Sequence, residues 1–319
     1  MSVQQLKNFQ YSNDIDFVWL ELTDDCNLNC IHCYGESGEK SSDNNLLSFS
    51  EYKTTLSNLS ILGCKQVQFL GGEPTLNKHL PQLINCAKAN NYTFIEIFSN
   101  LINISEKLFE HFISNEVNIA TSVYSHIPEV HDEITMKKGS FNKTIGNIKR
   151  ILASNIALRV SIIEMSINKN HMDDTIQFLK SIGVKHIGTD KMRPFGRASS
   201  KSTKASLKDL CGSCAGSTLC IAPNGNVSPC IMSKQWSIGS IRADSLSSLV
   251  KSKSLRKLRK NIYINTFEQR LPKSDQTNAE CTPGCNPTCG PACSPCTPHC
   301  GPACSPYCSP ACAPKHAKV

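Results

Sequence analysis

The chain has 319 residues, an apolar content of 39% and a formal net charge of +8. This length suffices for one large catalytic domain with a smaller appendage, and the apolar content is ordinary for a globular protein. No apolar run is long enough to span a bilayer, and the first 20 residues lack the basic and apolar regions of a secretory signal. We therefore expect a cytoplasmic protein, in which thiols stay reduced and clustered cysteines bind metal more often than they form disulfides.

Short apolar runs alternate along the chain with longer amphipathic patterns, and these predict strands and helices respectively. The predicted strands cover residues 16–23, 66–72, 93–100, 117–124, 157–165 and 186–192. The predicted helices include residues 48–63, 79–91, 140–155 and 171–183. Because strand and helix alternate, we expect parallel strands joined by crossover helices, which form a barrel or an open α/β sheet.

Three cysteines, Cys26, Cys30 and Cys33, follow the first predicted strand directly. Barrels of parallel strands carry their chemistry on such segments, so we expect the three thiols at the catalytic face. A structural zinc ion needs four protein ligands, and the nearest further donor, His32, stands between two of the cysteines. A [4Fe–4S] cluster held by three cysteines instead leaves one iron open to bind and activate a small molecule.

The pattern CxxxCxxC, with His32 before the last cysteine, resembles the signature of the radical S-adenosylmethionine (SAM) superfamily. GGEPTL, after the second predicted strand, is similar to the GGE segment of that family. FSN and TSVYS end the next two strands, where family members place polar residues, and the segment 131–152 resembles the peptide-modifying branch. The resemblance covers about residues 14–200.

This resemblance implies an α/β fold with a partial (β/α)6 barrel of the TIM type, and a [4Fe–4S] cluster on the three cysteines that binds SAM. In the family, the GGE segment receives the amino group of SAM, and polar residues at the following strand ends surround its ribose and carboxylate. The matching residues are Gly71, Gly72, Glu73, Pro74, Ser99, Asn100 and Ser122. A strand-ending turn with a capping Glu is the alternative for GGEP. Tyr124 departs from the pattern, because many relatives carry an acidic residue there.

No catalytic acid or base is fixed by the sequence. Asp190 and Arg193 stand at the end of the sixth predicted strand and Arg197 follows it, and each either faces the barrel mouth or is a solvated charge. The isolated cysteines Cys64 and Cys86 lie in helical patterns, so we expect them to be small core residues.

A second group of cysteines follows a polar linker after residue 200, and its members are Cys211, Cys214, Cys220 and Cys230. The turn sequence PNGNV predicts a β-hairpin that directs Cys220 and Cys230 toward one site. Cys220, Gly225 and Cys230 resemble the opening of a SPASM domain, a C-terminal module of peptide-modifying radical SAM enzymes. This resemblance implies one or two auxiliary iron–sulfur clusters, and a zinc knuckle made by the four cysteines is the alternative.

The densest basic block, residues 251–260, lies beside leucines at near-helical spacing. We predict an amphipathic helix with a solvated basic face and expect no nucleic-acid or membrane partner. A basic groove that attracts an acidic peptide is the alternative.

The C-terminal tail carries nine cysteines between residues 281 and 312, interleaved with prolines that disfavour helix and strand. It does not match the usual SPASM ending. The cysteines assigned first to auxiliary clusters are Cys281, Cys285, Cys289 and Cys293. A disordered or metal-scavenging tail is the alternative. The expected organisation is a radical SAM core at 1–200, a SPASM-like domain at 201–270 and the tail at 271–319.

The resemblance implies a radical SAM enzyme that generates a 5′-deoxyadenosyl radical and modifies a ribosomally synthesised precursor peptide by cross-linking, epimerisation or oxidation. Its expected partners are that peptide and an external electron donor such as ferredoxin or flavodoxin. A dehydrogenase acting on a sugar or aminocyclitol is the enzymatic alternative. A non-catalytic metal-binding protein, suggested by the tail alone, is the alternative from a different class.

We predict that deleting residues 281–319 lowers the iron content of the anaerobically reconstituted chain, because some tail cysteines ligate auxiliary clusters. Iron counting on the full and shortened chains measures the difference. An unchanged iron content would exclude the tail as a source of cluster ligands.

Overall fold

The computed structural model describes residues 14–39, 45–199 and 205–266. Six parallel strands form the main part of its sheet, in the spatial order β6-β5-β4-β3-β2-β1. Their bounds are β1 (Phe17–Glu21), β2 (Gln66–Leu70), β3 (Phe94–Phe98), β4 (Asn118–Ser122), β5 (Leu158–Glu164) and β6 (His186–Lys191). All six predicted strands are confirmed, and their order is that of a partial TIM-type barrel.

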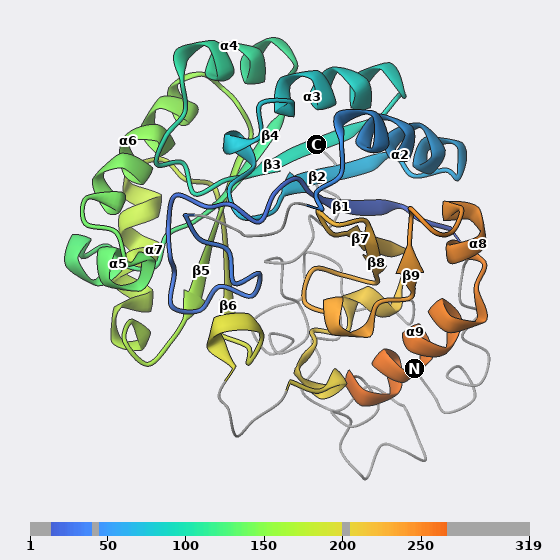
Figure 1. Cartoon of the computed structure of the whole chain (residues 1–319). Coiled ribbons are helices and arrows are strands. Elements are labelled where there is room, and N and C mark those ends of the chain that lie inside the picture. Colours follow the sequence, from blue (N-terminus) through green and yellow to red (C-terminus); the bar gives the residue numbers. More distant parts are fainter. Residues whose placement is uncertain (1–13, 40–44, 200–204, 267–319) are drawn as a thin grey trace, which may run out of the picture.

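Helices cover the outer side of the curved sheet, as Figure 1 shows. They are α2 (Phe49–Ile61), α3 (Leu80–Ala89), α4 (Glu106–Ser114), α5 (Pro128–Thr135), α6 (Ser140–Ala153) and α7 (Met172–Ser181). Local sequence explains where they begin: Ser48 and Glu51 form a capping box at α2, Ser105 caps α4, and α5 begins at a proline. The four predicted helices are confirmed.

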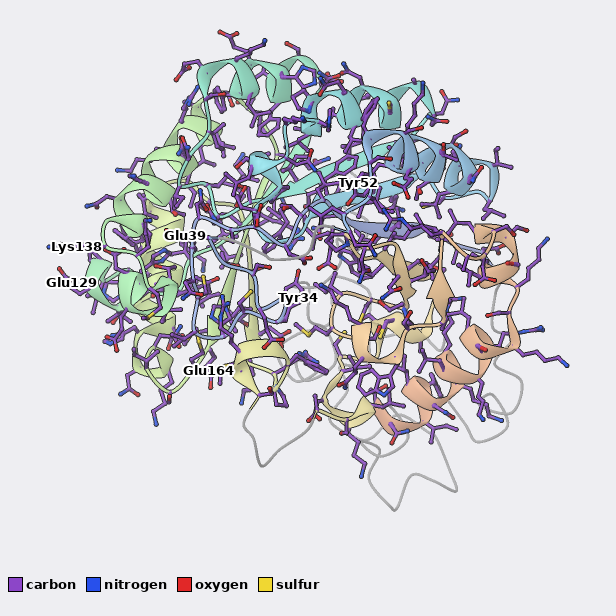
Figure 2. All side chains as sticks on the ribbon, in the orientation of Figure 1. Tyr34, Glu39, Tyr52, Glu129, Lys138 and Glu164 are labelled. Carbon is purple, nitrogen blue, oxygen red and sulfur yellow. The ribbon has the colours of Figure 1, made fainter. Side chains whose placement is uncertain are left out.

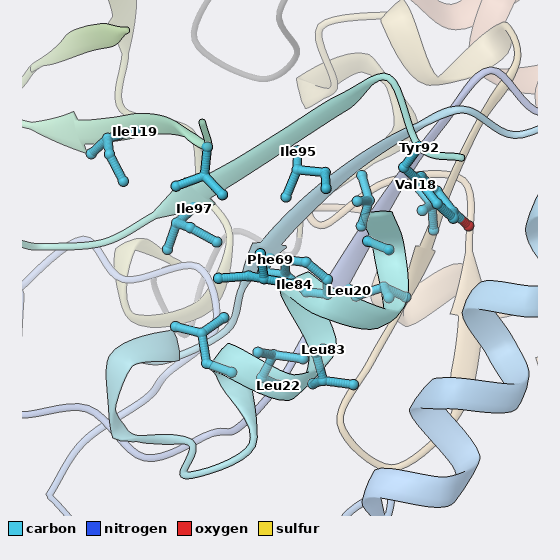
Figure 3. Packing of buried hydrophobic residues seen from close by; sticks show 14 of the residues in the cluster. Val18, Leu20, Leu22, Phe69, Leu83, Ile84, Tyr92, Ile95, Ile97 and Ile119 are labelled. Carbon is cyan, nitrogen blue, oxygen red and sulfur yellow. The ribbon is translucent and has the colours of Figure 1, made fainter. Parts of the chain in front are cut away.

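The main hydrophobic core lies between the strands and these helices. Val18, Leu20 and Leu22 of the first strand segment point to this side and are at most 1% exposed. Figure 3 shows them close to Leu83 and Ile84 of α3. Because side chains alternate along a strand, Phe17, Trp19 and Glu21 point to the opposite, inner side of the sheet. The alternation therefore separates an apolar outer face from an inner face that carries polar groups.

A buried charge network crosses this inner face. The guanidinium of Arg159 on β5 donates from Nε and Nη2 to the two carboxylate oxygens of Glu96 on β3, each at 2.8 Å. Gln68 on β2 donates to the same carboxylate. Glu96 and Gln68 are 1% and 2% exposed. The bidentate pair with Arg159 offsets the cost of burying the Glu96 carboxylate and the guanidinium. A polar network therefore crosses the inner face, on the same side of the sheet as the apolar cluster of Phe17 and Trp19.

The predicted hairpin is present, and it continues the barrel sheet. Its strands are β7 (Thr218–Ile221) and β8 (Asn226–Ser228), followed by β9 (Gly239–Ser240). β7 pairs in parallel with β1, which places Cys220 beside Trp19. The pairing covers the edge of β1 that a six-stranded sheet would leave open. Because one sheet runs through both parts, the domain boundaries at residues 200 and 270 remain predictions.

The basic amphipathic segment forms two helices, α8 (Leu246–Val250) and α9 (Lys253–Thr266), because the chain turns at Ser252 and its hydroxyl accepts from the amide of Leu255. Leu255 is fully buried, and the solvated basic face is present. Arg259 is the exception in the basic block: it is 2% exposed and its Nη2 donates to the carbonyl of Thr218 at 3.0 Å. In the part of the chain described here, no helix combines the length and apolar character needed to cross a membrane.

Candidate functional site

One pocket opens at the carboxyl ends of the strands, inside the arc of helices, and Tyr34, labelled in Figure 2, is part of its lining. Eight of the ten residues predicted to hold the first cluster and SAM line it together. These are Cys26, Cys30, Cys33, Gly71, Gly72, Ser99, Asn100 and Ser122. They come from four strand ends that are separated in sequence, so the parallel sheet is what brings them to one place.

The segment from residue 22 to residue 38, the cysteine loop, is held against neighbouring backbone. The amide of Cys26 donates to the carbonyl of Gly38 at 2.8 Å, which closes the loop on itself. The amides of Asn29 and Ile31 donate to carbonyls of the last turn of α5, at 3.2 and 3.0 Å. These carbonyls lack partners within their own helix, so the loop uses acceptors that a helix end leaves available.

The two glycines after β2 permit a close approach to the cysteine loop. The amide of Gly72 donates to the carbonyl of Thr23 at 2.7 Å, and the amide of Glu73 donates to that of Asp25 at 2.8 Å. A Cβ on Gly71 would lie 2.4 Å from the Thr23 oxygen, and a Cβ on Gly72 would lie 2.1 Å from the Asp25 oxygen. Gly71 also has φ of +137°. The glycines therefore permit a close contact between two protein segments. Their predicted contact with SAM stays a prediction.

The side chain of Glu73 points under the pocket and does not line it. Its carboxylate accepts from the hydroxyl of Ser99 and from the amide of Asn100, both at 2.8 Å, and from the amide and hydroxyl of Thr75. It thereby caps the short helix η1 (Pro74–Leu76) and fixes the end of β3. The predicted contact of Glu73 and Pro74 with SAM stays a prediction, and the observed contacts make Glu73 a brace between two strand ends.

Asn100 connects three segments at the base of the cysteine loop. Its Nδ2 donates to Oδ1 of Asn27 at 2.7 Å and lies 3.8 Å from Sγ of Cys26. Its carbonyl accepts from the hydroxyl of Thr144 on α6 at 2.9 Å. The backbone of Asn100 is held in turn by Glu73. The first cysteine is therefore positioned by a chain of hydrogen bonds that begins at the GGE segment.

Aromatic rings form the wall between the cysteine loop and β4. The rings of His32 and Tyr124 meet edge to face at 4.8 Å, and Tyr124 lies 5.3 Å from His131. Burial lowers the pKa of both histidines to about 4, so both rings are neutral at pH 7. Nδ1 of His32 is buried and has no hydrogen-bond partner within the structure. A neutral imidazole with an unused ring nitrogen fits a pocket wall that contacts a polar ligand.

The three thiols fit an iron–sulfur cluster better than a single ion. In the described residues, no group of three or more His, Cys, Asp or Glu side chains converges closely enough to hold one metal ion. Each cysteine of a [4Fe–4S] cluster binds a different iron, so its thiolates stay further apart than ligands of one zinc. Burial raises the pKa of Cys26 to about 11 and that of Cys30 to about 12, so iron binding must displace thiol protons.

The charged residues at the end of β6 and after it have separate roles. Asp190 and Arg193 line the pocket and pair with each other, because Nη2 of Arg193 lies 2.9 Å from both carboxylate oxygens. Their side chains are only 11% and 14% exposed. Arg197 does not line the pocket and binds the backbone of the cysteine loop. None of the three is therefore an isolated solvated charge.

The second cysteine group gathers beside the hairpin. Cys214, Cys220 and Cys230 belong to one buried cluster, and burial raises the pKa of Cys220 well above its ordinary value. Cys211 is half-buried and outside that cluster. The zinc knuckle stays the alternative prediction for these four cysteines. Their assignment to auxiliary clusters remains a prediction, and Cys281, Cys285, Cys289 and Cys293 lie outside the described residues.

A buried ion pair joins the barrel to the hairpin next to these cysteines. Nζ of Lys234 lies 2.6 Å from Oε2 of Glu21, which in turn lies 3.9 Å from Sγ of Cys220. Although burial favours the neutral amine, the Glu21 carboxylate holds the pKa of Lys234 above its ordinary value. The Glu21 carboxylate, paired with Lys234, therefore lies beside a predicted cluster ligand.

Several pocket residues were not singled out from the sequence. Gln68 and Ser161 line the pocket from β2 and β5, and His131 and Thr144 line it from α5 and α6. Polar residues at alternate positions in otherwise apolar strands were the available signal for the first two. The two helical residues gave no such signal, because only the packing of their helices shows that they face the pocket.

Sequence profiles agree with this geometry. The profile described as radical SAM superfamily matches residues 20–185, just over half of the chain. The SPASM profile, described as an iron-sulfur cluster-binding domain, matches residues 211–290.

Individual relatives share between a quarter and a third of their aligned residues with this chain. The antilisterial bacteriocin subtilosin biosynthesis protein AlbA of Bacillus subtilis is 26% identical over 272 residues, which cover 75% of this chain and 60% of AlbA. A probable GTP 3′,8-cyclase of Methanocaldococcus jannaschii is 28% identical over 178 residues, which cover 54% of this chain and 58% of the cyclase. The chain thus spans about 60% of the length of these two relatives.

Among solved structures, SuiB of Streptococcus suis bound to S-adenosylmethionine has a TM-score of 0.65 at 14% identity, covering 81% of this chain and 70% of SuiB. SuiB bound to the precursor peptide SuiA has a TM-score of 0.64 at 13% identity, covering 81% and 69%. At such identities the likeness shows a shared fold.

We predict that Gly72→Ala abolishes or strongly reduces iron loading at the cysteine loop, because a Cβ there would displace the Asp25 carbonyl. Iron content and SAM binding of the reconstituted variant measure the effect. Gly146→Ala is the matched control, since this exposed glycine of α6 has nothing within 4 Å of an added Cβ. The control should load fully and gain up to about 1 kcal/mol of stability. Full loading of Gly72→Ala would contradict this account of the glycine.

Proposed function

The chain belongs to the radical SAM superfamily, and from that premise we propose that it generates a 5′-deoxyadenosyl radical and uses it to modify a ribosomally synthesised peptide. The observation that carries the proposal is the pocket at the strand ends. It combines Cys26, Cys30 and Cys33 with the glycine pair and with polar residues of the next two strand ends. When bound, the cluster and SAM supply reductive cleavage of a carbon–sulfur bond.

In this proposal the protein residues hold and orient both groups. Cys26, Cys30 and Cys33 would hold the cluster, and SAM would bind at the position they leave open. The backbone of Gly71 and Gly72 and the side chains at the ends of β3 and β4 position SAM along the strand ends. His32 and Tyr124 exclude water from one side of the pocket, because their rings close the wall between the cysteine loop and β4. This exclusion protects a reactive radical from side reactions.

The apolar lining of the pocket and the named relatives support a peptide substrate. The pocket lining includes the apolar side chains Ile163, Met192, Ile231 and Met232. Met192 is 43% exposed at the pocket, and methionine side chains adapt to varied apolar partners. AlbA is named for bacteriocin biosynthesis, and SuiB has been solved with a precursor peptide. We therefore place a peptide segment between the hairpin and the cysteine loop.

A small-molecule substrate is the second candidate. The match to a probable GTP 3′,8-cyclase favours it, because that protein is named for a nucleotide substrate. The Asp190–Arg193 pair would then offer polar contacts at the pocket wall. A non-catalytic storage role has no need of the glycine pair or of the Glu73 brace.

The proposed reaction consumes one electron per SAM cleaved, so it requires an external donor such as ferredoxin or flavodoxin. Auxiliary clusters held by the SPASM-like part would accept or pass an electron during oxidation of the peptide. We place this chemistry in the cytoplasm, where thiols stay reduced until they bind iron.

We predict that the anaerobically reconstituted chain cleaves SAM to 5′-deoxyadenosine under reducing conditions and that Cys30→Ala abolishes the cleavage. Cys30 is half-buried in the cysteine loop, and its loss removes one of three proposed ligands. Cys86→Ala is the control, because this half-buried cysteine of α3 lies outside the pocket. Chromatography of 5′-deoxyadenosine measures both. Cleavage retained by Cys30→Ala would refute the assignment of the loop.

The mass of a candidate peptide after turnover identifies the reaction. We expect a precursor peptide encoded next to the gene to lose two hydrogens, for a cross-link or oxidation, or to take up deuterium without other change, for epimerisation. Mass spectrometry in normal and heavy water separates these outcomes. A peptide that stays unmodified, while a sugar or aminocyclitol loses two hydrogens, would favour the small-molecule candidate.

A further inference from the structure

The cysteine loop contains no helix or strand between residues 26 and 37, so its shape depends on contacts with other parts of the chain. The end of α5 supports one side through the amides of Asn29 and Ile31. The other side rests on the turn that follows β6, whose helical part is η3 (Gly196–Ala198).

Arg197 in this turn binds three carbonyls of the cysteine loop. Its Nε donates to the carbonyl of Cys30 at 2.8 Å, and its Nη2 donates to that of Ser37 at 2.8 Å. Its backbone amide donates to the carbonyl of Cys33 at 3.0 Å. Two of the three acceptors belong to cysteines of the cluster motif. The planar guanidinium reaches two carbonyls at once, which the single ammonium of a lysine does not match.

Gly196 allows Arg197 to come this close. A Cβ on Gly196 would lie 2.4 Å from the carbonyl oxygen of Cys33 and 2.5 Å from that of Tyr34. The φ of Gly196 is +56°, a region that residues with a side chain seldom adopt. The turn is therefore built to place a guanidinium directly against the cysteine loop.

Arg197 acts on the site through its charge as well as through its hydrogen bonds. Its Nε lies 2.8 Å from the carbonyl oxygen of Cys30, on the backbone of a predicted ligand. The guanidinium is thus close enough to favour negative charge at the cysteines. A [4Fe–4S] cluster becomes more negative by one charge when it takes up an electron, and net charge and hydrogen bonding set its reduction potential.

We propose that Arg197 is a positioning residue that holds the cysteine loop in its cluster-binding shape and raises the reduction potential of the cluster bound there. Its fixed positive charge stabilises the reduced cluster more than the oxidised one. This inference rests on the proposed function, because it assumes a redox-active cluster on Cys26, Cys30 and Cys33.

Two variants of the full chain separate the charge from the hydrogen bonds. Arg197→Gln removes the charge, and Arg197→Lys keeps it but loses the planar fork. Arg242→Gln is the matched control. Arg242 also bridges loop carbonyls, with donors 3.0 and 2.9 Å from the carbonyls of Asn45 and Leu46, but it lies outside the pocket.

The readout is a redox titration followed by electron paramagnetic resonance on anaerobically reconstituted protein, with dithionite as the electron source. The part of the signal that changes when SAM is added identifies the cluster of the cysteine loop and separates it from auxiliary clusters. We expect Arg197→Gln to shift the midpoint of that signal to more negative potential. Arg197→Lys should keep the wild-type midpoint but carry less iron, and Arg242→Gln should match the wild type in both.

A wild-type midpoint and iron content in Arg197→Gln would overturn the proposal. If that variant loads no iron, Arg197→Lys decides, because a midpoint that falls despite the retained charge would also overturn it. If Arg242→Gln loses as much iron as Arg197→Gln, the loss of iron reflects general destabilisation, and the proposal is overturned. Absence of any SAM-responsive signal in the wild-type chain would instead refute the proposed function, so the two failures are distinguishable.

Discussion

The close approach of two backbone segments, residues 23–25 and 71–72, is the constraint on which the site depends. Gly71 and Gly72 permit it because a Cβ at either position would overlap a carbonyl of the first segment. The approach aligns the end of β2 with the start of the cysteine loop through two backbone hydrogen bonds. Every later contact of the site builds on this alignment, including the Glu73 brace and the bond from Asn100 to Asn27.

The cysteine loop is irregular, and rigid elements fix it from three sides. The glycine pair holds its start, the end of α5 holds its middle, and Arg197 holds the carbonyls of its second half. An irregular segment loses much conformational entropy when it becomes ordered, so external contacts must supply the compensating free energy. Ligands placed in this way are pre-organised for cluster binding, and the loop can still present its thiols to the pocket.

Buried charges organise the inner face of the barrel in pairs. Glu96 with Arg159 spans the strands beneath the pocket, and Glu21 with Lys234 joins the barrel to the hairpin. Each pair holds elements from distant parts of the sequence in a defined register, and removing one partner would leave a buried charge uncompensated. The pairing of β7 with β1 adds a continuous sheet to this link. The cysteines beside the hairpin therefore sit on the same rigid body as the pocket.

The sequence by itself determined the strands, the helices and the loop that carries the three cysteines. Apolar alternation and helical periodicity are local properties, so all six parallel strands and the hairpin could be read from them. The count of three cysteines and the GGE segment predicted the position of the pocket for the same reason. The basic segment was predicted less well, because a local turn capped by Ser252 divides it into two helices and Arg259 is buried against Thr218 of β7.

Only the tertiary structure decided which distant groups meet. Arg197 contacts Cys30 across 167 residues, Glu73 turns toward Ser99 instead of the pocket, and β7 takes the free edge of β1. No local pattern encodes these contacts, because each depends on the curvature of the sheet and on the few directions in which a side chain can leave its backbone. The sequence thus predicted the ligands of the site, and packing decided which groups orient them.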